Sequence, residues 1–365
     1  MQIKCNVLDR QFQMYQAEYE EAALRVLRSG WYVLGNEVLA FEKAFAMYTG
    51  RKYCVGLNSG LDALVLSVRA LGIGAGDEVL VQSNTYIATV LGITENGAVP
   101  VFVEPDEHYN IDAAKIDAAI TDKTKAVLVT HLYGQASNMA PIVELAKKHH
   151  LELIEDCAQS HGACFGGQMT GTFGRAGCFS FYPTKNLGAF GDAGAVVTDD
   201  EELAGKLRMM RNYGSKVRYH NEIEGVNSRL DEMQAALLRV KLGHLDALNV
   251  ERKELAQRYD EGIVNPNIVL PRLRAQAESI YHQYVIRCTD RDALQAYLAE
   301  QDIQTQIHYP IPPHLAACYK YLGCHKGDYP IAERYANQVL SLPLYTGMTR
   351  AEQQYVIDKL NAYRF

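Results

Sequence analysis

The sequence lacks the long apolar runs of a membrane protein. None of its 365 residues belongs to a stretch of about 18 consecutive apolar residues, the length that a membrane-spanning helix requires. The first residues, Met1 to Asn6, also contain no apolar signal core. We therefore expect a cytoplasmic protein with no membrane partner.

The sequence also lacks an excess of basic residues. The chain has 36 Lys and Arg against 43 Asp and Glu, a formal net charge of −7, and no basic run. Its isoelectric point is near 5.9. Proteins that bind nucleic acids generally depend on clustered positive charge, so we expect no nucleic-acid partner.

The eight cysteines form no Cys-x-x-Cys pair. This scatter favours free thiols in a reducing compartment over disulfides, and it gives no zinc ligand pattern. The doublet His149-His150 lies at a predicted helix end without cysteines nearby, where it would complement the helix dipole. We predict no metal site.

Internal repeats, low-complexity segments and proline-rich linkers are absent too. Through the first two thirds of the chain, short runs typical of buried strands alternate with helical patterns, which predicts an α/β fold with a mostly parallel sheet. The predicted strands are residues 53–57, 78–82, 99–103, 125–129 and 151–156.

The pattern changes after about residue 228. A long amphipathic helix is predicted over residues 230–259, followed by a strand at 284–286 and a helix at 290–301. Because 365 residues are many for one hydrophobic core, we expect a large domain at 1–250 and a smaller C-terminal α+β domain at 251–365.

Two glycine-containing segments could bind phosphate. Gly72 to Gly76 follows a predicted helix and precedes a strand, so we interpret it as a turn. Ser59 and Gly60 instead follow a strand and open a helix, where backbone amides and the helix dipole favour an anion. The alternative for this second segment is an ordinary helix cap.

One lysine stands among aromatic and small residues about thirty positions after an acid that ends a predicted strand. Lys185 and Asp156 are the two groups that pyridoxal phosphate requires: an amine that binds the cofactor covalently and a carboxylate that keeps its ring nitrogen protonated. Gln159 and Ser180 could reach the same ligand. A solvated loop lysine and a turn or capping acid are the alternative interpretation.

The chain resembles the DegT/StrS family of nucleotide-sugar aminotransferases, which have the fold type I architecture. The likeness extends over nearly the whole sequence and rests on several motifs together. These are GWYVLG at 30–35, NSG at 58–60, GDEV at 76–79, DCAQSHGA at 156–163, the lysine stretch at 180–194 and NSRLDEMQAA at 227–236.

The resemblance implies a role for each matching residue. Lys185 and Asp156 match the catalytic lysine and the ring-nitrogen partner, and Gln159 matches a residue near the ring hydroxyl. Tyr86 matches the aromatic residue that stacks on the cofactor. The phosphate-binding residues correspond to Ser59, Gly60 and Ser180, with Asn227 donated by the neighbouring subunit of a homodimer with shared active sites.

A narrower likeness concerns the substrate. The chain is similar to members that aminate thymidine-diphosphate (dTDP) 3-keto-6-deoxyhexoses with glutamate as amino donor, and this implies a product destined for an O-antigen, S-layer or other polysaccharide. Tyr182, His308 and Tyr309 would bind the hexose, and Arg218 would lie near the diphosphate or sugar. A packed loop remains the alternative for His308 and Tyr309.

Other functions stay open at this point. The enzyme could act on a 4-keto sugar nucleotide instead, or the chain could be a non-catalytic relative that binds the cofactor for regulation. Lys185 and Asp156 together argue against the regulatory alternative, and Lys185 also argues against the family's dehydratases, which have histidine there. A nicotinamide dehydrogenase lacks support because no glycine fingerprint is correctly placed.

Overall fold

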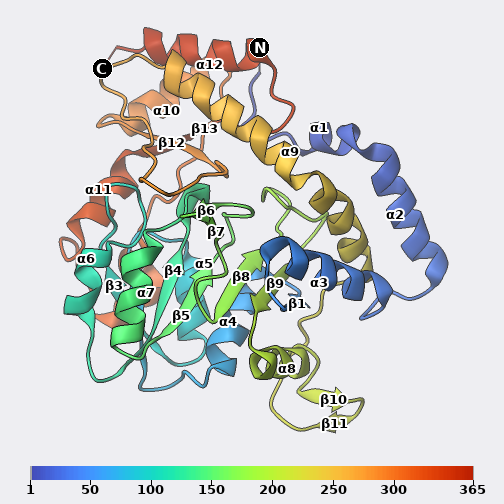
Figure 1. The fold of residues 1–365 in the computed structure, drawn as a ribbon. Coiled ribbons are helices and arrows are strands. Elements are labelled where there is room, and N and C mark those ends of the chain that lie inside the picture. The colour runs from blue at the N-terminus through green and yellow to red at the C-terminus, as the bar shows by residue number, and fades with distance from the viewer. Residues whose placement is uncertain (1, 365) are drawn as a thin grey trace.

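The computed structural model describes residues 2–364, and its centre is a seven-stranded sheet (Figure 1). The strand order is β1-β9-β8-β5-β4-β2-β3. Strand β9 runs antiparallel to β1 and β8, whereas the other neighbouring pairs are parallel. The bounds are β1 Tyr53–Leu57, β2 Glu78–Gln82, β3 Val99–Val103, β4 Thr124–Thr130, β5 Glu152–Asp156, β8 Ala176–Ser180 and β9 Gly194–Thr198. The predicted α/β fold with a mostly parallel sheet is confirmed.

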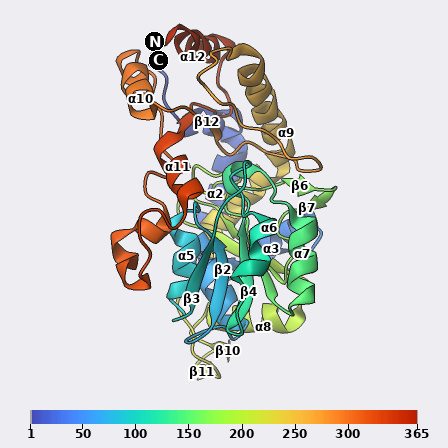
Figure 2. The same cartoon turned by 90° about the vertical axis from the view of Figure 1, so that its left-hand side faces the viewer.

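Helices cover both faces of this sheet. On one face, apolar side chains of α4 (Gly60–Ala70), α5 (Ile87–Thr94) and α8 (Glu201–Met210) form one buried cluster with the strands. On the other face lie α3 (Asn36–Thr49) and α7 (Met139–Lys148). Figure 2 shows α5 and α7 on opposite sides of the sheet. Burial on both faces explains why the strands are nearly continuous apolar runs in the sequence.

The remaining elements extend the sheet domain or form the C-terminal part of the molecule. The short strands are β6 Cys164–Phe165, β7 Gln168–Met169, β10 Ser215–Val217, β11 His220–Asn221, β12 Tyr284–Arg287 and β13 Val339–Leu342. The other α-helices are α1 Leu8–Met14, α2 Gln16–Ser29, α6 Ala113–Ile116, α9 Glu232–Gly262, α10 Arg291–Glu300, α11 Pro330–Gln338 and α12 Arg350–Ala362. Single 3-10 turns occupy Asp117–Ala119, Leu132–Gly134, Pro313–Leu315 and Ala317–Leu322.

Helix α9 has 31 residues and connects two hydrophobic clusters. Leu238 and Leu245 pack in the cluster beside α3, whereas Leu255 and Tyr259 pack with β12 and β13. Position 250 therefore lies inside a continuous helix, and the division of the chain at 250/251 stays a prediction. No helix within residues 2–364 is both long and apolar enough to cross a membrane.

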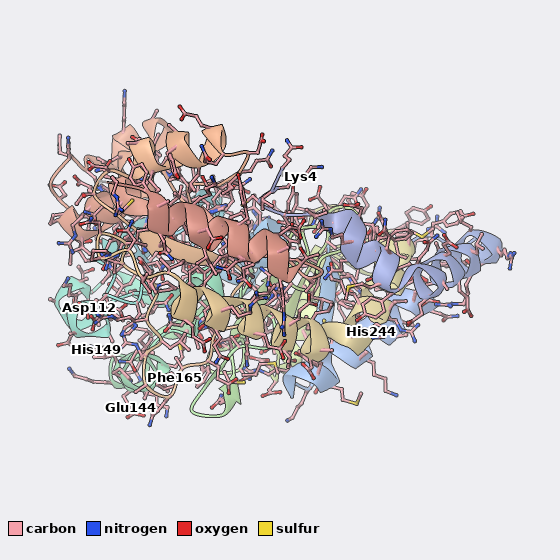
Figure 3. The ribbon with its side chains drawn as sticks, turned by 90° about the horizontal axis from the view of Figure 1, so that it is seen from above. Lys4, Asp112, Glu144, His149, Phe165 and His244 are labelled. Carbon is pink, nitrogen blue, oxygen red and sulfur yellow. The ribbon has the colours of Figure 1, made fainter. Side chains whose placement is uncertain are left out.

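The N-terminal segment is held against α9 and the C-terminal elements. Ile3 is fully buried in the cluster of β12 and β13. Arg10 makes a bidentate pair with Glu352 at 2.6 and 2.7 Å. On α9, His244 stacks on the Tyr15 ring at 3.8 Å, and Figure 3 shows His244 from above. These contacts fix both ends of the chain close to the helix that carries part of the site described below.

Candidate active site

The predicted site residues converge at one edge of the sheet. Asp156 and Ser180 end the parallel strands β5 and β8, and Ser59 and Tyr86 follow β1 and β2. Lys185 lies in the loop after β8. Since the carboxyl ends of parallel strands meet at the same edge, segments far apart in the sequence come together there, where ligands of such sheets bind.

Asp156 is a buried carboxylate at this edge, with 5% of its surface exposed. Its Oδ2 accepts a hydrogen bond from the Thr89 hydroxyl at 2.7 Å, and its Oδ1 accepts one from the Ala158 amide at 3.1 Å. Burial raises the pKa of Asp156, while these two donors and the charge of Lys185 oppose the rise. The site therefore holds a carboxyl group in a poorly hydrated place with its orientation fixed.

A chain of threonine hydroxyls supports that orientation. Thr85 lies 2.7 Å from Thr89 and 3.1 Å from Thr130, hydroxyl to hydroxyl, and all three residues are buried. Because a carboxylate only accepts hydrogen bonds, Thr89 must direct its proton toward Asp156. The sequence analysis did not identify Thr85 or Thr89 as functional, although both flank Tyr86 in the sequence.

The amine of Lys185 has no partner within the part of the chain that the structure describes. Its backbone amide closes a turn on the Tyr182 carbonyl at 2.8 Å, and its side chain is partly exposed. Among residues 2–364, no side-chain hydrogen bond or ion pair of Lys185 is present. Desolvation lowers the pKa of Lys185 to about 8, against the opposing charge of Asp156. A lowered pKa makes the neutral, nucleophilic amine accessible near neutral pH.

The next residue anchors the lysine loop to α9. The Asn186 side-chain amide donates to Asn249 Oδ1 at 2.8 Å and to the Ile280 carbonyl at 3.1 Å. Both asparagines are buried. Asn186 and Asn249 were also missed from the sequence, because a buried amide pair has no local pattern.

Ser59, Gly60 and Ser180 meet where α4 begins. Ser59 Oγ accepts from the Asp62 amide at 3.1 Å, so it caps the helix and keeps its own proton available. A Cβ added to Gly60 would lie 2.4 Å from the Ser180 Cβ, a distance that only glycine avoids. This close approach places two hydroxyls beside a helix N-terminus, an arrangement that suits a phosphate.

Gln159 connects this edge to the C-terminal part of the chain. Its Oε1 accepts from the Tyr133 amide at 2.6 Å, and its Nε2 donates to the Tyr309 hydroxyl at 3.1 Å. The Tyr309 ring lies 4.9 Å from that of Tyr86, which is half exposed. His308 precedes Tyr309, and burial, together with the charge of Lys185, lowers the pKa of His308. The structure thus brings these predicted residues together around Lys185.

Three other predicted residues have no side-chain partner at this edge. Tyr182 is exposed. Arg218 lies in the β10–β11 hairpin, over the Tyr219 ring at 4.9 Å, at the end of the molecule away from α10 and α12 (Figures 1 and 2). Asn227 is exposed as well. A contact of Arg218 with a substrate stays a prediction.

The segment of Asn227 lies beside the start of α4. Ser228 Oγ donates to Asp62 at 2.6 Å and accepts from the Asn58 amide at 3.1 Å. Asn227 itself has no side-chain partner among residues 2–364. Its contribution to a neighbouring subunit therefore also stays a prediction.

A buried group of potential metal ligands lies beneath the site. Glu155 accepts from the amides of Gly171, Phe173 and Gly174, each at 2.7 Å, and its carboxylate lies 3.0 Å from His131 Nε2. The other ring nitrogen of His131 accepts from the Ser137 amide. These bonds engage the carboxylate of Glu155 and both ring nitrogens of His131, and the buried thiol of Cys157 is the third member of the group. We interpret Glu155 as the structural anchor of the loop at 171–174.

Comparisons with known proteins show the family of the chain. Residues 13–361 match the model of the DegT/DnrJ/EryC1/StrS aminotransferase family. The chain belongs to this family. A curated relative, the dTDP-3-amino-3,6-dideoxy-alpha-D-galactopyranose transaminase of Aneurinibacillus thermoaerophilus, is 52% identical over 98% of each chain.

Solved structures of other family members have the same fold. S. venezuelae DesV, in complex with a ketimine intermediate, superposes with a TM-score of 0.97 at 46% identity, over 99% of this chain and 98% of that one. NtdA from Bacillus subtilis, with bound cofactor PMP, gives a TM-score of 0.89 at 32% identity, over 97% of this chain and 83% of that one.

DegT-family aminotransferases bind pyridoxal phosphate, and the residues of this member fit that cofactor. The unpartnered amine of Lys185 and the buried carboxylate of Asp156 are the two groups the cofactor ring requires. At the N-terminus of α4, Gly60 packs against Ser180, and the neighbouring Ser59 caps the helix, so two serine hydroxyls lie where the phosphate would bind. The lysine, the carboxylate and the serines therefore suit the aldehyde, the ring nitrogen and the phosphate of the cofactor, respectively.

Lys185→Ala should abolish turnover and leave the fold intact, since it removes both the covalent anchor and the proton carrier. Borohydride reduction followed by mass spectrometry should find the cofactor attached to the wild-type chain and not to the variant. Lys147→Ala, which removes a lysine exposed on α7, is the control and should keep both properties. Substantial turnover by Lys185→Ala without an added amine would refute the assignment.

Asp156→Asn should slow the reaction by orders of magnitude while the cofactor still binds, because the change removes the charge that favours a protonated ring nitrogen. The Thr89 hydroxyl can turn to accept from the new amide, so the fold should persist. Single-turnover absorbance changes on adding glutamate would measure the rate. A near-normal rate would mean that another residue meets the ring nitrogen.

Proposed function

We propose that this DegT-family aminotransferase moves an amino group from glutamate to a keto sugar nucleotide. The substrate we favour is a dTDP-3-keto-6-deoxyhexose, and the product is the corresponding dTDP-3-amino-3,6-dideoxyhexose. The observation that carries this choice is the 52% identity, over nearly both full lengths, to a transaminase of a dTDP-3-amino-3,6-dideoxyhexose.

Lys185 and Asp156 would carry the chemistry. When bound, pyridoxal phosphate supplies an electron-withdrawing ring that stabilises negative charge on the carbon beside the transferred nitrogen. Lys185 Nζ, once free, takes a proton from the substrate carbon and returns it on the other side of the nitrogen as base and then acid. Asp156 maintains the positive charge of the ring, and its burial strengthens that interaction relative to water.

The remaining predicted residues would bind and orient the ligands. Ser59, Gly60 and Ser180 would hold the phosphate at the start of α4, and Tyr86 would provide an aromatic surface for the cofactor ring. For the sugar we propose hydrogen bonds from Tyr182, His308 and Tyr309. Gln159 supports this part of the site, because it already bonds the Tyr309 hydroxyl at 3.1 Å.

We further propose a homodimer with shared active sites, in which Asn227 and Arg218 act on the neighbouring subunit. The exposure of both side chains in the single chain supports this proposal. All eight cysteines are free thiols, which supports a reducing compartment such as the cytoplasm. A surface polysaccharide is the destination we propose for the amino sugar.

Amination of a panel of keto sugar nucleotides tests the function. The purified protein with glutamate should convert the dTDP-3-keto sugar to an amine at C3, seen by mass spectrometry and proton NMR. The same assay with 4-keto sugar nucleotides and with uridine-linked keto sugars provides the comparison. Preferential amination at C4 would select the alternative substrate, and no amination together with no spectral response to glutamate would select the regulatory alternative.

Mixing two inactive variants should restore activity if the site is shared. Lys185→Ala and Asn227→Trp should each inactivate their own homodimer. A mixed dimer places both lesions in one site and leaves the other native, so complete subunit exchange should return about one quarter of wild-type activity. Turnover of the mixture measures this outcome.

Native mass spectrometry of the mixture is the control, because it shows whether subunits have exchanged. If one chain supplied all groups of its own site, every mixed dimer would have one lesion per site. Confirmed exchange without recovered activity would therefore refute the shared site.

A further inference from the structure

A buried serine contacts the imidazole of His308. Ser341 lies in the middle of β13 with 1% of its surface exposed. Its Oγ is 2.8 Å from His308 Nδ1. None of the roles considered above involves Ser341, and its strand is separated from His308 by 33 positions in the sequence.

The burial of the hydroxyl decides which group donates. Ser341 Oγ has no other hydrogen-bond partner among residues 2–364. If it accepted a proton from Nδ1, its own proton would be buried without an acceptor, which costs about 1 to 3 kcal/mol. The hydroxyl must therefore donate to Nδ1. In a neutral imidazole only one nitrogen has a proton, so that proton resides on Nε2.

The environment also keeps the ring neutral. Burial, assisted by the charge of Lys185, lowers the pKa of His308 to about 4. Within residues 2–364 no carboxylate is paired with this histidine, and the group that faces Nδ1 is the neutral hydroxyl of Ser341. At neutral pH, therefore, Nδ1 is unprotonated and faces Ser341, and Nε2 has the proton.

The backbone around the ring is fixed as well. Gln306 and Ser341 exchange two main-chain hydrogen bonds of 2.7 and 3.2 Å, and the Tyr133 hydroxyl donates to the His308 carbonyl. His308 Nε2 has no partner among residues 2–364, and the side chain is partly exposed. It is therefore free to donate to a ligand next to Lys185.

We propose that Ser341 is a positioning residue that holds His308 in its Nε2-protonated form, so that His308 donates a hydrogen bond to an oxygen of the keto sugar and does not act as a base. The identity of the ligand rests on the proposed function, whereas the protonation state of the free protein does not. A carbonyl oxygen only accepts hydrogen bonds, so a fixed donor suits a keto substrate.

The protonation state can be read directly in cofactor-free protein. Nitrogen-15 NMR of histidine-labelled protein, with His308→Gln used to identify the resonances, should show a protonated Nε2 and a bare, hydrogen-bonded Nδ1. Ser341→Ala should shift both resonances toward a mixture of the two neutral forms. The pKa of His308 should also rise, since donation to Nδ1 favours the neutral ring. A protonated Nδ1 in the wild type would overturn the proposal.

Kinetics with the keto sugar provide the second readout. Ser341→Ala should lower kcat/KM for the sugar by up to about tenfold, the net worth of one neutral hydrogen bond, and leave the half-reaction with glutamate unchanged. Ser341→Thr keeps a hydroxyl and should restore most of the rate. Ser67→Ala, which removes another fully buried hydroxyl, controls for general destabilisation.

Replacements of His308 separate donation from basicity. Glutamine places an amide N–H close to the position of Nε2, whereas asparagine is too short to do so, and neither is a base. His308→Gln should therefore retain more activity than His308→Asn, and equal losses would contradict the donor role. If the wild type aminated no sugar at all, the proposed function would fail, and the NMR result would still decide the role of Ser341.

Discussion

The burial of one carboxylate imposes most of the order at this site. Asp156 is buried at the end of β5, and a charge without hydrogen-bond partners there would strongly destabilise the fold. Thr89 and the Ala158 amide each donate one hydrogen bond to it, and Thr89 is in turn held by Thr85. A cationic ring would complete this set of partners. The same hydroxyl chain fixes the start of α5, and with it the neighbouring Tyr86.

A second constraint is the close packing of main chain at the carboxyl edge of the sheet. Gly60 lies against Ser180, and a Cβ at Gly194 would lie 2.2 Å from the Ser59 carbonyl oxygen. Glycines at these two positions let α4 begin directly above β8 and β9. Backbone packing thus fixes the positions of the Ser59 and Ser180 hydroxyls. A ligand that binds there loses little free energy in ordering them.

The regular part of the fold could be predicted from the sequence because it depends on local patterns. The strands at 53–57, 78–82 and 99–103 have the predicted bounds, since each is an apolar run between turn residues. Strands β8 and β9 were missed, because the runs AGCFS and GAVVT are short and rich in small residues. Lys185 and Asp156 were predicted from their spacing, and the structure places both at the carboxyl edge of the sheet. Thr89, Asn186 and Ser341 could not be predicted in this way, since each acts through a contact that only the folded chain creates.

The pairing of Arg10 with Glu352 has a consequence for how the molecule is made. These residues are separated by 342 positions, and Ile3 is buried among side chains of the last strands and helices. During synthesis, Ile3 and Arg10 leave the ribosome long before Glu352 has been made, so their partners become available late. The sheet can form earlier from nearer neighbours, whereas closure of the C-terminal cluster is delayed. Until residues 255–360 of that cluster have been made, Ile3 has no apolar partners there and stays exposed on the nascent chain.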